Sequence, residues 1–372
     1  MNIFDYIDKY GDYSFDEKEF NDIDNLVFSS LIYVDLEKYV SNNFLGKRNI
    51  YNVGKDFFDD YNVKSKNITA TKVGINVLRL IMNKKRYKDL LLYNYSYIGD
   101  NNQQFSAVTI EINKDLVYVS FEGTDQLISG WKEDFMMSYK FPVLAQRMAI
   151  NYMNKYFSLS RKKIIVGGHS KGGNLAMSVG MYSNLLVRNK INKIYNNDGP
   201  GFREKEYNSN NYKNIKDKLV YIIPNYSVVG LLLKHSTDYV VVKSLKKGIY
   251  AHNLSNWMLK DDKLQVVELS NYSKLVDKTV LNWLKKHSDN ERENFVESLF
   301  LIFDKANIRD LIDIMNNKKL IFSVIKNSTE LDNKTRNMIM DFIYLFLDLF
   351  KEAKINEIES FFHNNVFIKH NW

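Results

Sequence analysis

Hydrophobic residues recur along the chain in two different patterns. In residues 24–40, 73–82 and 145–156 they return every third or fourth position, as on one face of an amphipathic helix. Between residues 90 and 244, short runs rich in β-branched and aromatic residues are typical of buried strands. Strands that alternate with helices predict an α/β fold with a mostly parallel sheet flanked by helices. The expected strands cover residues 90–98, 105–112, 116–123, 164–166, 193–202, 218–230 and 238–244.

The pattern changes near residue 270, after which strand signals are few. With 372 residues, the chain exceeds the ~250–300 residues at which a single hydrophobic core stops growing. We therefore expect a first domain over residues 1–269, with N-terminal helices (1–88) before a sheet core (89–269). A helical C-terminal region over residues 270–372 follows it. Its expected helices, which are rich in Leu, Ile and Phe, cover 276–287, 291–304, 308–315, 318–328 and 333–353.

The segment from Lys162 to Gly180, KKIIVGGHSKGGNLAMSVG, combines a strand, a glycine-rich turn and a helix of small residues. Ser170 lies in this turn between Gly168 and Gly172, in the pattern G-x-S-x-G of a nucleophile elbow. The glycines are needed because strand and helix approach closely and the backbone at the serine is strained. The segment predicts an α/β-hydrolase-like fold with Ser170 as an exposed nucleophile. The alternative is a glycine-rich connection with an idle serine.

Composition and charge exclude several other kinds of chemistry. The chain has no cysteine, which excludes disulfides, thiolate metal sites and a cysteine nucleophile. Its net charge of +8 comes from 52 basic and 44 acidic residues scattered along the sequence, a pattern that does not indicate nucleic-acid binding. The acidic N-terminus shows no secretory signal, and no apolar run reaches the ~18–20 residues of a membrane helix. We expect a cytoplasmic protein without an integral membrane segment.

A nucleophilic serine needs a neighbouring base, and that base needs an orienting group. In α/β-hydrolases the catalytic histidine follows the last strand, in the chain order Ser, Asp, His. His252 comes after the strand 238–244 and meets this requirement, whereas His235 lies between two strands. The sequence therefore favours His252 as the base and keeps His235 as the alternative. His169 is adjacent to Ser170, and we expect its side chain to be buried or to line the site.

Three residues are candidates for the group that orients the histidine. Asp198 closes the strand before the Gly-Pro-Gly turn, at the same edge of the sheet as the elbow, and is the first choice. Asp238, just before the last strand, is the second. Ser227, a neutral orienter, is the third and stands where most members of the fold carry a carboxylate. The competing interpretation of Asp198 is an Asx-turn residue that stabilises the bend.

The strand 116–123 is followed by the turn Gly123-Thr124. In α/β-hydrolases the loop after this strand supplies an oxyanion donor, and Thr124 could offer both its N–H group and its hydroxyl. A tight turn at the end of a strand is the alternative interpretation. Together with the elbow, the pattern favours an oxyanion hole.

Six motifs in fixed order resemble a bacterial family of uncharacterised lipase-like α/β-hydrolases, which is distantly similar to the class 3, fungal-type lipases. The resemblance spans about residues 15–260. The motifs are FEGTD (Phe121 to Asp125), GWKEDF, GGHSKGGNLA, NNDGPGF, P-x-x-S-x-V-G and A-H-x-x-x-x-W.

This resemblance implies Ser170 as nucleophile, His252 as base, and Thr124 with the backbone of Lys171 as oxyanion hole. In class 3 lipases the acid belongs where Ser227 stands, whereas the Asp-x-Pro-Gly turn at Asp198 looks like the acid placement of pancreatic-type lipases. The Lys171 side chain, where fungal lipases usually carry an apolar residue, suggests a different or anionic substrate.

The leading functional hypothesis is a serine hydrolase that cleaves carboxylic esters, lipase-like or esterase-like, through an acyl-enzyme on Ser170. It requires no metal or organic cofactor, and its partner is a small-molecule or lipid ester substrate. Peripheral contact with a membrane is compatible with the positive charge. The alternative hypothesis is a catalytically weak or inactive binding or scaffolding module that acts through its helical C-terminal region.

Overall fold

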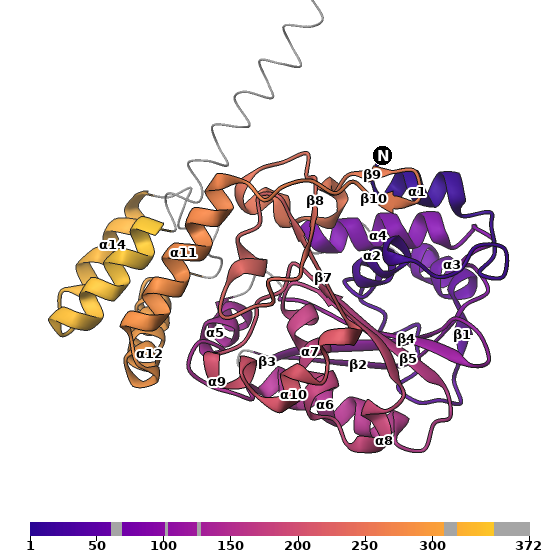
Figure 1. Cartoon of the computed structure of the whole chain (residues 1–372), viewed down its shortest axis with the longest axis horizontal. Coiled ribbons are helices and arrows are strands. Elements are labelled where there is room, and N and C mark those ends of the chain that lie inside the picture. The colour runs from indigo at the N-terminus through magenta and orange to yellow at the C-terminus, as the bar shows by residue number, and fades with distance from the viewer. Residues whose placement is uncertain (61–68, 101–102, 125–127, 309–317, 346–372) are drawn as a thin grey trace, which may run out of the picture.

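An eight-stranded sheet forms the centre of the protein (Figure 1). The computed structural model describes residues 1–60, 69–100, 103–124, 128–308 and 318–345. The strands lie side by side in sequence order. The first four strands pair antiparallel, and from the fourth strand to the eighth the pairing is parallel. They are β1 (Arg48–Asn49), β2 (Leu91–Asp100), β3 (Gln103–Glu111), β4 (Leu116–Phe121), β5 (Lys163–His169), β6 (Ile191–Asn197), β7 (Leu219–Pro224) and β8 (Val240–Val242). A small separate sheet pairs β9 (Leu259–Lys260) with β10 (Lys263–Leu264).

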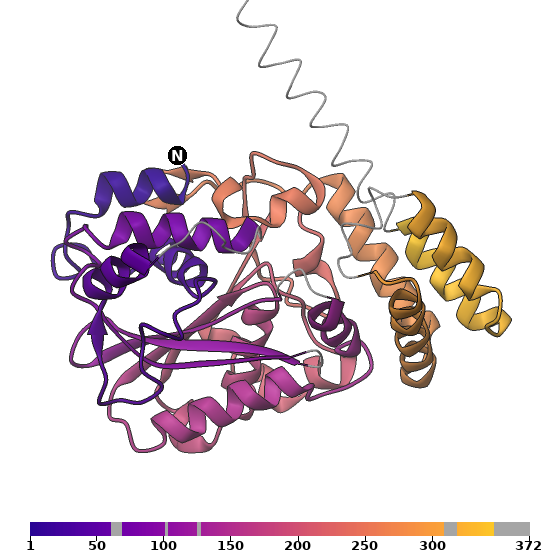
Figure 2. The same ribbon diagram turned by 180° about the vertical axis from the view of Figure 1, so that it is seen from behind.

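Helices cover both faces of the central sheet (Figures 1 and 2). Four N-terminal helices lie on one face: α1 (Ile3–Tyr10), α2 (Asp22–Leu31), α3 (Ile50–Asp60) and α4 (Thr69–Ile81). On the other face lie α6 (Leu144–Phe157), α7 (Lys171–Tyr182), α8 (Leu185–Arg188), α9 (Glu204–Tyr207) and α10 (Asn210–Lys213). This architecture confirms the predicted α/β-hydrolase-like fold, a mostly parallel sheet flanked by helices.

Alternating side chains of each central strand supply the two hydrophobic cores. In β4, Val117 and Val119 pack with α6 and α7, whereas Tyr118 points toward α2. The ends of the strands are tied to α2 by polar groups: Asn197 Nδ2 donates to Asn25 Oδ1 at 3.1 Å and to the Gly168 carbonyl at 3.0 Å. These bonds fix the end of β6 against the end of β5, where the candidate site residues follow.

The C-terminal part is helical and packs beside α5 (Ile128–Met136). It contains α11 (Asn271–Lys286), α12 (Asp289–Lys305), α14 (Lys318–Ser328) and a helical stretch over 333–345. Residues of α5, α12, α14 and 333–345 share one hydrophobic cluster. The division into domains at 269/270 stays a prediction, because α5 from the first part belongs to this cluster. The expected helix 308–315, apart from residue 308, and residues 346–353 lie outside the described residues.

Several expected elements are shorter in the structure. The strand expected over 193–202 ends at Asn197, because Asp198 takes a φ of 52° and a Gly-Pro-Gly turn follows. The strand expected over 218–230 ends at Pro224, whose ring lacks an N–H for the ladder. The helix expected over 24–40 ends at Leu31. Among the described residues, no helix combines the length and apolar character that crossing a bilayer requires.

Candidate active site

Ser170 occupies a strained turn between β5 and α7. Its φ of 59° and ψ of −133° lie in a region that residues other than glycine adopt rarely. A Cβ atom added to Gly172 would lie 2.1 Å from the Phe121 carbonyl oxygen, and one on Gly168 would lie 2.4 Å from the Gly172 carbonyl carbon. Backbone contacts between strands and helix therefore hold the serine in this conformation. Ser170 is only 9% exposed, so the expectation of an exposed serine is wrong. The side chain lines a cavity, and a substrate would reach it from there.

Asp198 and His252 come together at the ends of different strands. Asp198 follows β6 directly and is fully buried, and His252 ends the 3-10 helix η3 (Gly248–His252) after β8. The two side chains are joined by a hydrogen bond of 2.6 Å between His252 Nδ1 and Asp198 Oδ2. A carboxylate only accepts, so Nδ1 carries the proton and Nε2 of the neutral ring is an acceptor. This is the tautomer that a base for a serine hydroxyl needs.

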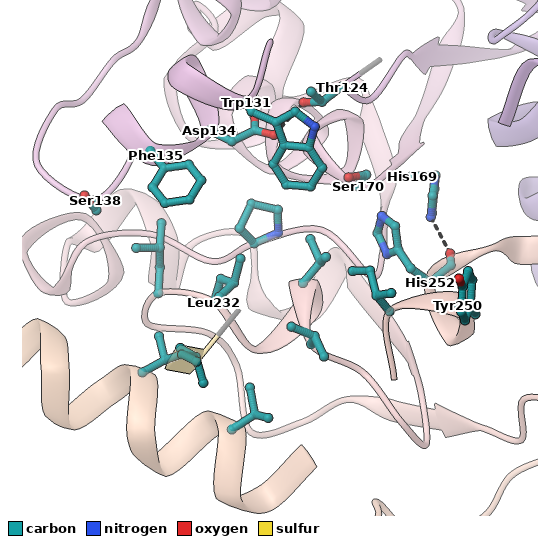
Figure 3. A pocket seen from close by; sticks show the side chains of 18 of the residues that line it. Thr124, Trp131, Asp134, Phe135, Ser138, His169, Ser170, Leu232, Tyr250 and His252 are labelled. Carbon is teal, nitrogen blue, oxygen red and sulfur yellow. Dashed lines mark hydrogen bonds between the residues drawn. The ribbon is translucent and has the colours of Figure 1, made fainter. Parts of the chain in front are cut away.

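Ser170 and His252 line the same cavity, and Figure 3 shows the two side chains next to each other there. Among the described residues, no hydrogen bond to the Ser170 hydroxyl is formed. Such catalytic hydrogen bonds often tighten only when substrate is bound.

Ser227 contacts the acid and not the histidine. Its hydroxyl donates to Asp198 Oδ1 at 2.5 Å, and the Gly230 N–H donates to the same oxygen at 3.0 Å. Both carboxylate oxygens of Asp198 are therefore engaged, one by His252 and one by the loop after β7. The fold usually carries its acid where Ser227 stands. In this chain Ser227 instead hydrogen-bonds to Asp198, which follows the neighbouring strand β6.

The alternative histidine lies away from the elbow. His235 donates through Nδ1 to the Ser236 carbonyl oxygen at 2.9 Å, and its Nε2 is 3.1 Å from Asp277 Oδ1 of α11. It is not among the described residues that line the cavity of Ser170. Asp238 is exposed, and its backbone N–H donates to the Ser236 hydroxyl. The structure thus brings Asp198 to His252, and brings neither His235 nor Asp238 to the site.

His169 is buried and also lines the cavity. The sequence had left these two placements as alternatives. Its Nε2 lies 2.8 Å from the backbone carbonyl of His252, and its Nδ1 lies 3.0 Å from the Tyr33 hydroxyl. Because a carbonyl only accepts, Nε2 carries the proton and Nδ1 accepts from the tyrosine. Burial, and secondly the nearby His252, holds the pKa of His169 well below its usual value. A neutral His169 thus fixes the backbone that carries His252.

The turn after β4 lies directly against the elbow. A Cβ atom on Gly123 would be 3.0 Å from Ser170 Cβ, so the next residue, Thr124, stands beside the serine. Lys171 is the first residue of α7, whose N–H has no partner within the helix. In the part of the chain that the structure describes, the backbone N–H groups of Thr124 and Lys171 donate to no acceptor. Both are free to bind an oxyanion.

The Thr124 hydroxyl is committed elsewhere. It donates to Asp134 Oδ2 of α5 at 2.6 Å, which orients the threonine and leaves its backbone N–H as the available donor. Asp134 Oδ1 is buried and has no hydrogen-bond partner among the described residues. Burial raises the pKa of Asp134 to about 6, although Lys171 and the Thr124 hydroxyl act in the opposite direction.

The Lys171 side chain is buried behind the site. Its Nζ lies 3.2 Å from Glu133 Oε2 and 3.4 Å from the Gln104 carbonyl oxygen, and it is not among the described residues that line the cavity. The Lys171 side chain therefore gives no support to the different or anionic substrate that the resemblance suggested, and that suggestion stays a prediction. Within the described ranges, no group of three or more His, Asp or Glu residues is placed to hold a metal ion.

The cavity in front of Ser170 has a volume of about 960 Å³ and a mostly apolar lining. Its lining includes Val73 of α4, the elbow, α5 and the C-terminal helices; Figure 3 shows Trp131, Asp134 and Phe135 of α5 on one side of Ser170. Asp134 and Asp341 are the acidic residues in its described lining, which contains no Lys or Arg.

Three residues of this site were not predicted from the sequence. Trp131 and Asp134 belong to the motif GWKEDF, which was recognised in the sequence but to which no function was assigned. Tyr33 lies 136 positions before His169, and only the folded chain brings the two rings together.

Comparison with solved structures finds lipases at low similarity. The M37 lipase is 13% identical over 70% of this chain and 91% of its own, with a TM-score of 0.32. The Lip2 lipase from Yarrowia lipolytica is 14% identical over 52% of this chain and 77% of its own, with a TM-score of 0.34. A fungal lipase in complex with an inhibitor is 12% identical over 68% of this chain and 95% of its own, with a TM-score of 0.31.

No curated protein matches the sequence. A family model described as Mbeg1-like matches residues 81–301, which is more than half of the chain and includes the elbow, Asp198 and His252. This match confirms the resemblance to a lipase-like family, and the chain belongs to the Mbeg1-like family.

Proposed function

We propose that the protein is a serine hydrolase that cleaves carboxylic esters through an acyl-enzyme on Ser170. The observation that carries this proposal is the 2.6 Å hydrogen bond between Asp198 and His252 beside a serine on a strained elbow. The three side chains come from the ends of three separate elements. Bringing an Asp–His pair next to a strained serine serves no evident structural purpose. The apolar cavity in front of them suits the hydrocarbon part of an ester.

In the first half of the reaction, Ser170 Oγ attacks the ester carbonyl carbon while His252 Nε2 takes the hydroxyl proton. The carbonyl oxygen becomes an oxyanion, which accepts hydrogen bonds from the N–H groups of Thr124 and Lys171. Asp198 stabilises the imidazolium through Nδ1. The tetrahedral intermediate then breaks its bond to the leaving oxygen, which receives the proton from His252 and departs as an alcohol.

In the second half, a water molecule replaces the alcohol. His252 Nε2 removes a proton from the water, and the resulting hydroxide attacks the acyl carbon bound to Ser170. Collapse of the second intermediate returns the proton to Ser170 Oγ and releases a carboxylic acid. Every group that moves a proton in this cycle is a side chain of this protein, the substrate or water.

The proposal is tested by replacing the nucleophile. We expect Ser170→Ala to lower the hydrolysis of p-nitrophenyl esters by at least about 10⁴-fold, as in other enzymes that lose a triad member. The melting temperature should stay within a few degrees of the wild-type value, because the hydroxyl has no hydrogen-bond partner among the described residues. Comparable hydrolysis by the two proteins would refute the assignment of Ser170.

A further inference from the structure

The proposed reaction fixes the direction in which an ester lies across the site. The leaving oxygen must come within reach of His252 Nε2, because this nitrogen delivers its proton. The alcohol part therefore occupies the side of the cavity near His252, which is lined by Ile249, Tyr250 and Leu254. The acyl chain must leave Ser170 on the opposite side.

On that opposite side, the cavity lies between α5 and the C-terminal helices. Figure 3 shows Trp131 and Phe135 across Ser170 from His252, with Leu232 below them. Val280 and Trp283 of α11 continue this lining.

The far wall of this arm is held in place by a cluster of aromatic rings. Phe295 of α12 has its ring centroid 5.4 Å from that of Trp283 and 6.4 Å from that of Phe135. An ion pair of 2.7 Å between Lys132 and Glu297 also joins α5 to α12. Thus α11 and α12 form one surface with α5 along the cavity.

The charge of the lining restricts the chemistry of the chain that can lie there. Asp134 and Asp341 are the acidic groups among the described lining residues, which include no Lys or Arg side chain to pair with an anion. A carboxylate or phosphate at the far end of the acyl chain would face like charge and an apolar wall. An uncharged hydrocarbon chain gains from burial along the whole arm.

We propose that helices α11 and α12 of the C-terminal region form the acyl-binding wall of the active site and that the substrate is an ester of a long, uncharged acyl chain. This inference rests on the proposed function and deepens it. It gives α11 and α12 a role in specificity: Val280 and Trp283 contact the distal part of the acyl chain, while Phe295 holds Trp283 in position.

The test compares two tryptophan substitutions on the same helix. Val280→Trp fills the arm, whereas Asn282→Trp adds the same side chain at an exposed position outside the described lining. The measured quantity is the ratio of kcat/KM for p-nitrophenyl palmitate to kcat/KM for p-nitrophenyl butyrate. We expect this ratio to fall at least tenfold in Val280→Trp and to stay within twofold in Asn282→Trp, because blocking the burial of about two methylene groups is enough for a tenfold loss.

A binding experiment separates this inference from the proposed catalysis. In the Ser170→Ala background, a palmitoyl ester with a pyrene label is titrated by fluorescence, and Val280→Trp should weaken its binding at least tenfold. If wild type hydrolyses no ester but Val280→Trp still weakens binding selectively, the proposed function fails and the acyl wall stands. An unchanged chain-length ratio together with unchanged binding, or equal effects of Val280→Trp and Asn282→Trp, would overturn the acyl wall even if Ser170 is catalytic.

Discussion

Asp198 carries two hydrogen-bonding tasks on its two oxygens. Oδ2 faces His252, while Oδ1 is held by the Ser227 hydroxyl and the Gly230 N–H. The second pair of bonds fixes the rotation of the carboxylate, so that Oδ2 points to the histidine. Its φ of 52° is a conformation that Asp and Asn tolerate better than most residues.

Replacing this acid by its amide separates catalysis from structure. Asp198→Asn keeps the backbone conformation, but its amide nitrogen facing His252 favours the wrong tautomer of the ring. We expect the esterase rate to fall by up to ~10⁴-fold, with a small change in melting temperature. Ser227→Ala serves as the comparison and should lower the rate far less, because it leaves Oδ2 in contact with His252. If Asp198→Asn retained more than about a tenth of the activity, Asp198 would be a turn residue only.

Asp134 makes the stability of the folded protein depend on pH. Its folded-state pKa of about 6 lies above the ordinary value of 3.8, since burial disfavours the charged form. The folded protein therefore holds this proton more tightly than the unfolded chain. The resulting stabilisation is complete below about pH 4 and is lost as the pH rises through 6.

An amide at position 134 removes this dependence. Asn resembles the neutral acid and can still accept from Thr124, so Asp134→Asn should be more stable than wild type at pH 8, by up to about 3 kcal/mol for a shift of about two pKa units. At pH 4 the two proteins should be nearly equal. Urea unfolding at both values measures the difference; a variant that is less stable than wild type at pH 8 would show that the carboxylate is needed in its charged form.

Motif spacing predicted the candidate residues of the site but could not choose among all of them. Asp198, Ser227 and Asp238 each follow or precede a strand near one edge of the sheet, so sequence position alone left the three open. The choice depends on side-chain direction: Ser227 turns toward Asp198, and Asp238 points to solvent. The Lys171 side chain illustrates the same limit, because its direction toward Glu133 is set by α5, which is distant in sequence.

At the scale of elements, the contact of β4 with α7 determines where the nucleophile stands. Helix α7 begins at Lys171, immediately after the serine, and the approach of its first turn to β4 requires glycine at position 172. The sequence predicted this arrangement because a glycine pattern directly reports close approach. It did not predict α5, which is only nine residues long. A helix of this length is marginally stable on its own, and packing against α12 stabilises it.

Two glycine substitutions in α7 test the strand-to-helix contact. In Gly172→Ala the new methyl group meets backbone atoms of Phe121, so the helix must move, and we expect a loss of stability of about 1–3 kcal/mol together with a large loss of esterase activity. In Gly180→Ala it meets the end of the Ile194 side chain, which can shift, and helix propensity partly compensates. Thermal unfolding and ester hydrolysis measure both effects. Equal behaviour of the two variants would argue against the tight contact.

At the scale of the molecule, the cavity joins parts of the chain that are far apart in sequence. Its described lining runs along the chain from Ser30 of α2 to Leu345, so helices of the N-terminal part and of the C-terminal part both reach the site. The sequence predicted a helical C-terminal region from periodicity, but periodicity does not report what such helices cover. Under the alternative hypothesis, the protein is a binding module that acts through its helical C-terminal region. The structure instead places these helices along the cavity that contains Ser170 (Figure 3).

Covalent labelling with a fluorophosphonate tests the central claim most directly, because this probe reacts with a serine only when a base and an oxyanion hole activate it. We predict that wild type is labelled at a single site, identified by mass spectrometry as the peptide containing Ser170. Labelling should be absent in Ser170→Ala and strongly slowed in Asp198→Asn. A wild-type protein that stays unlabelled at every pH, or that is labelled at another serine, would contradict the account.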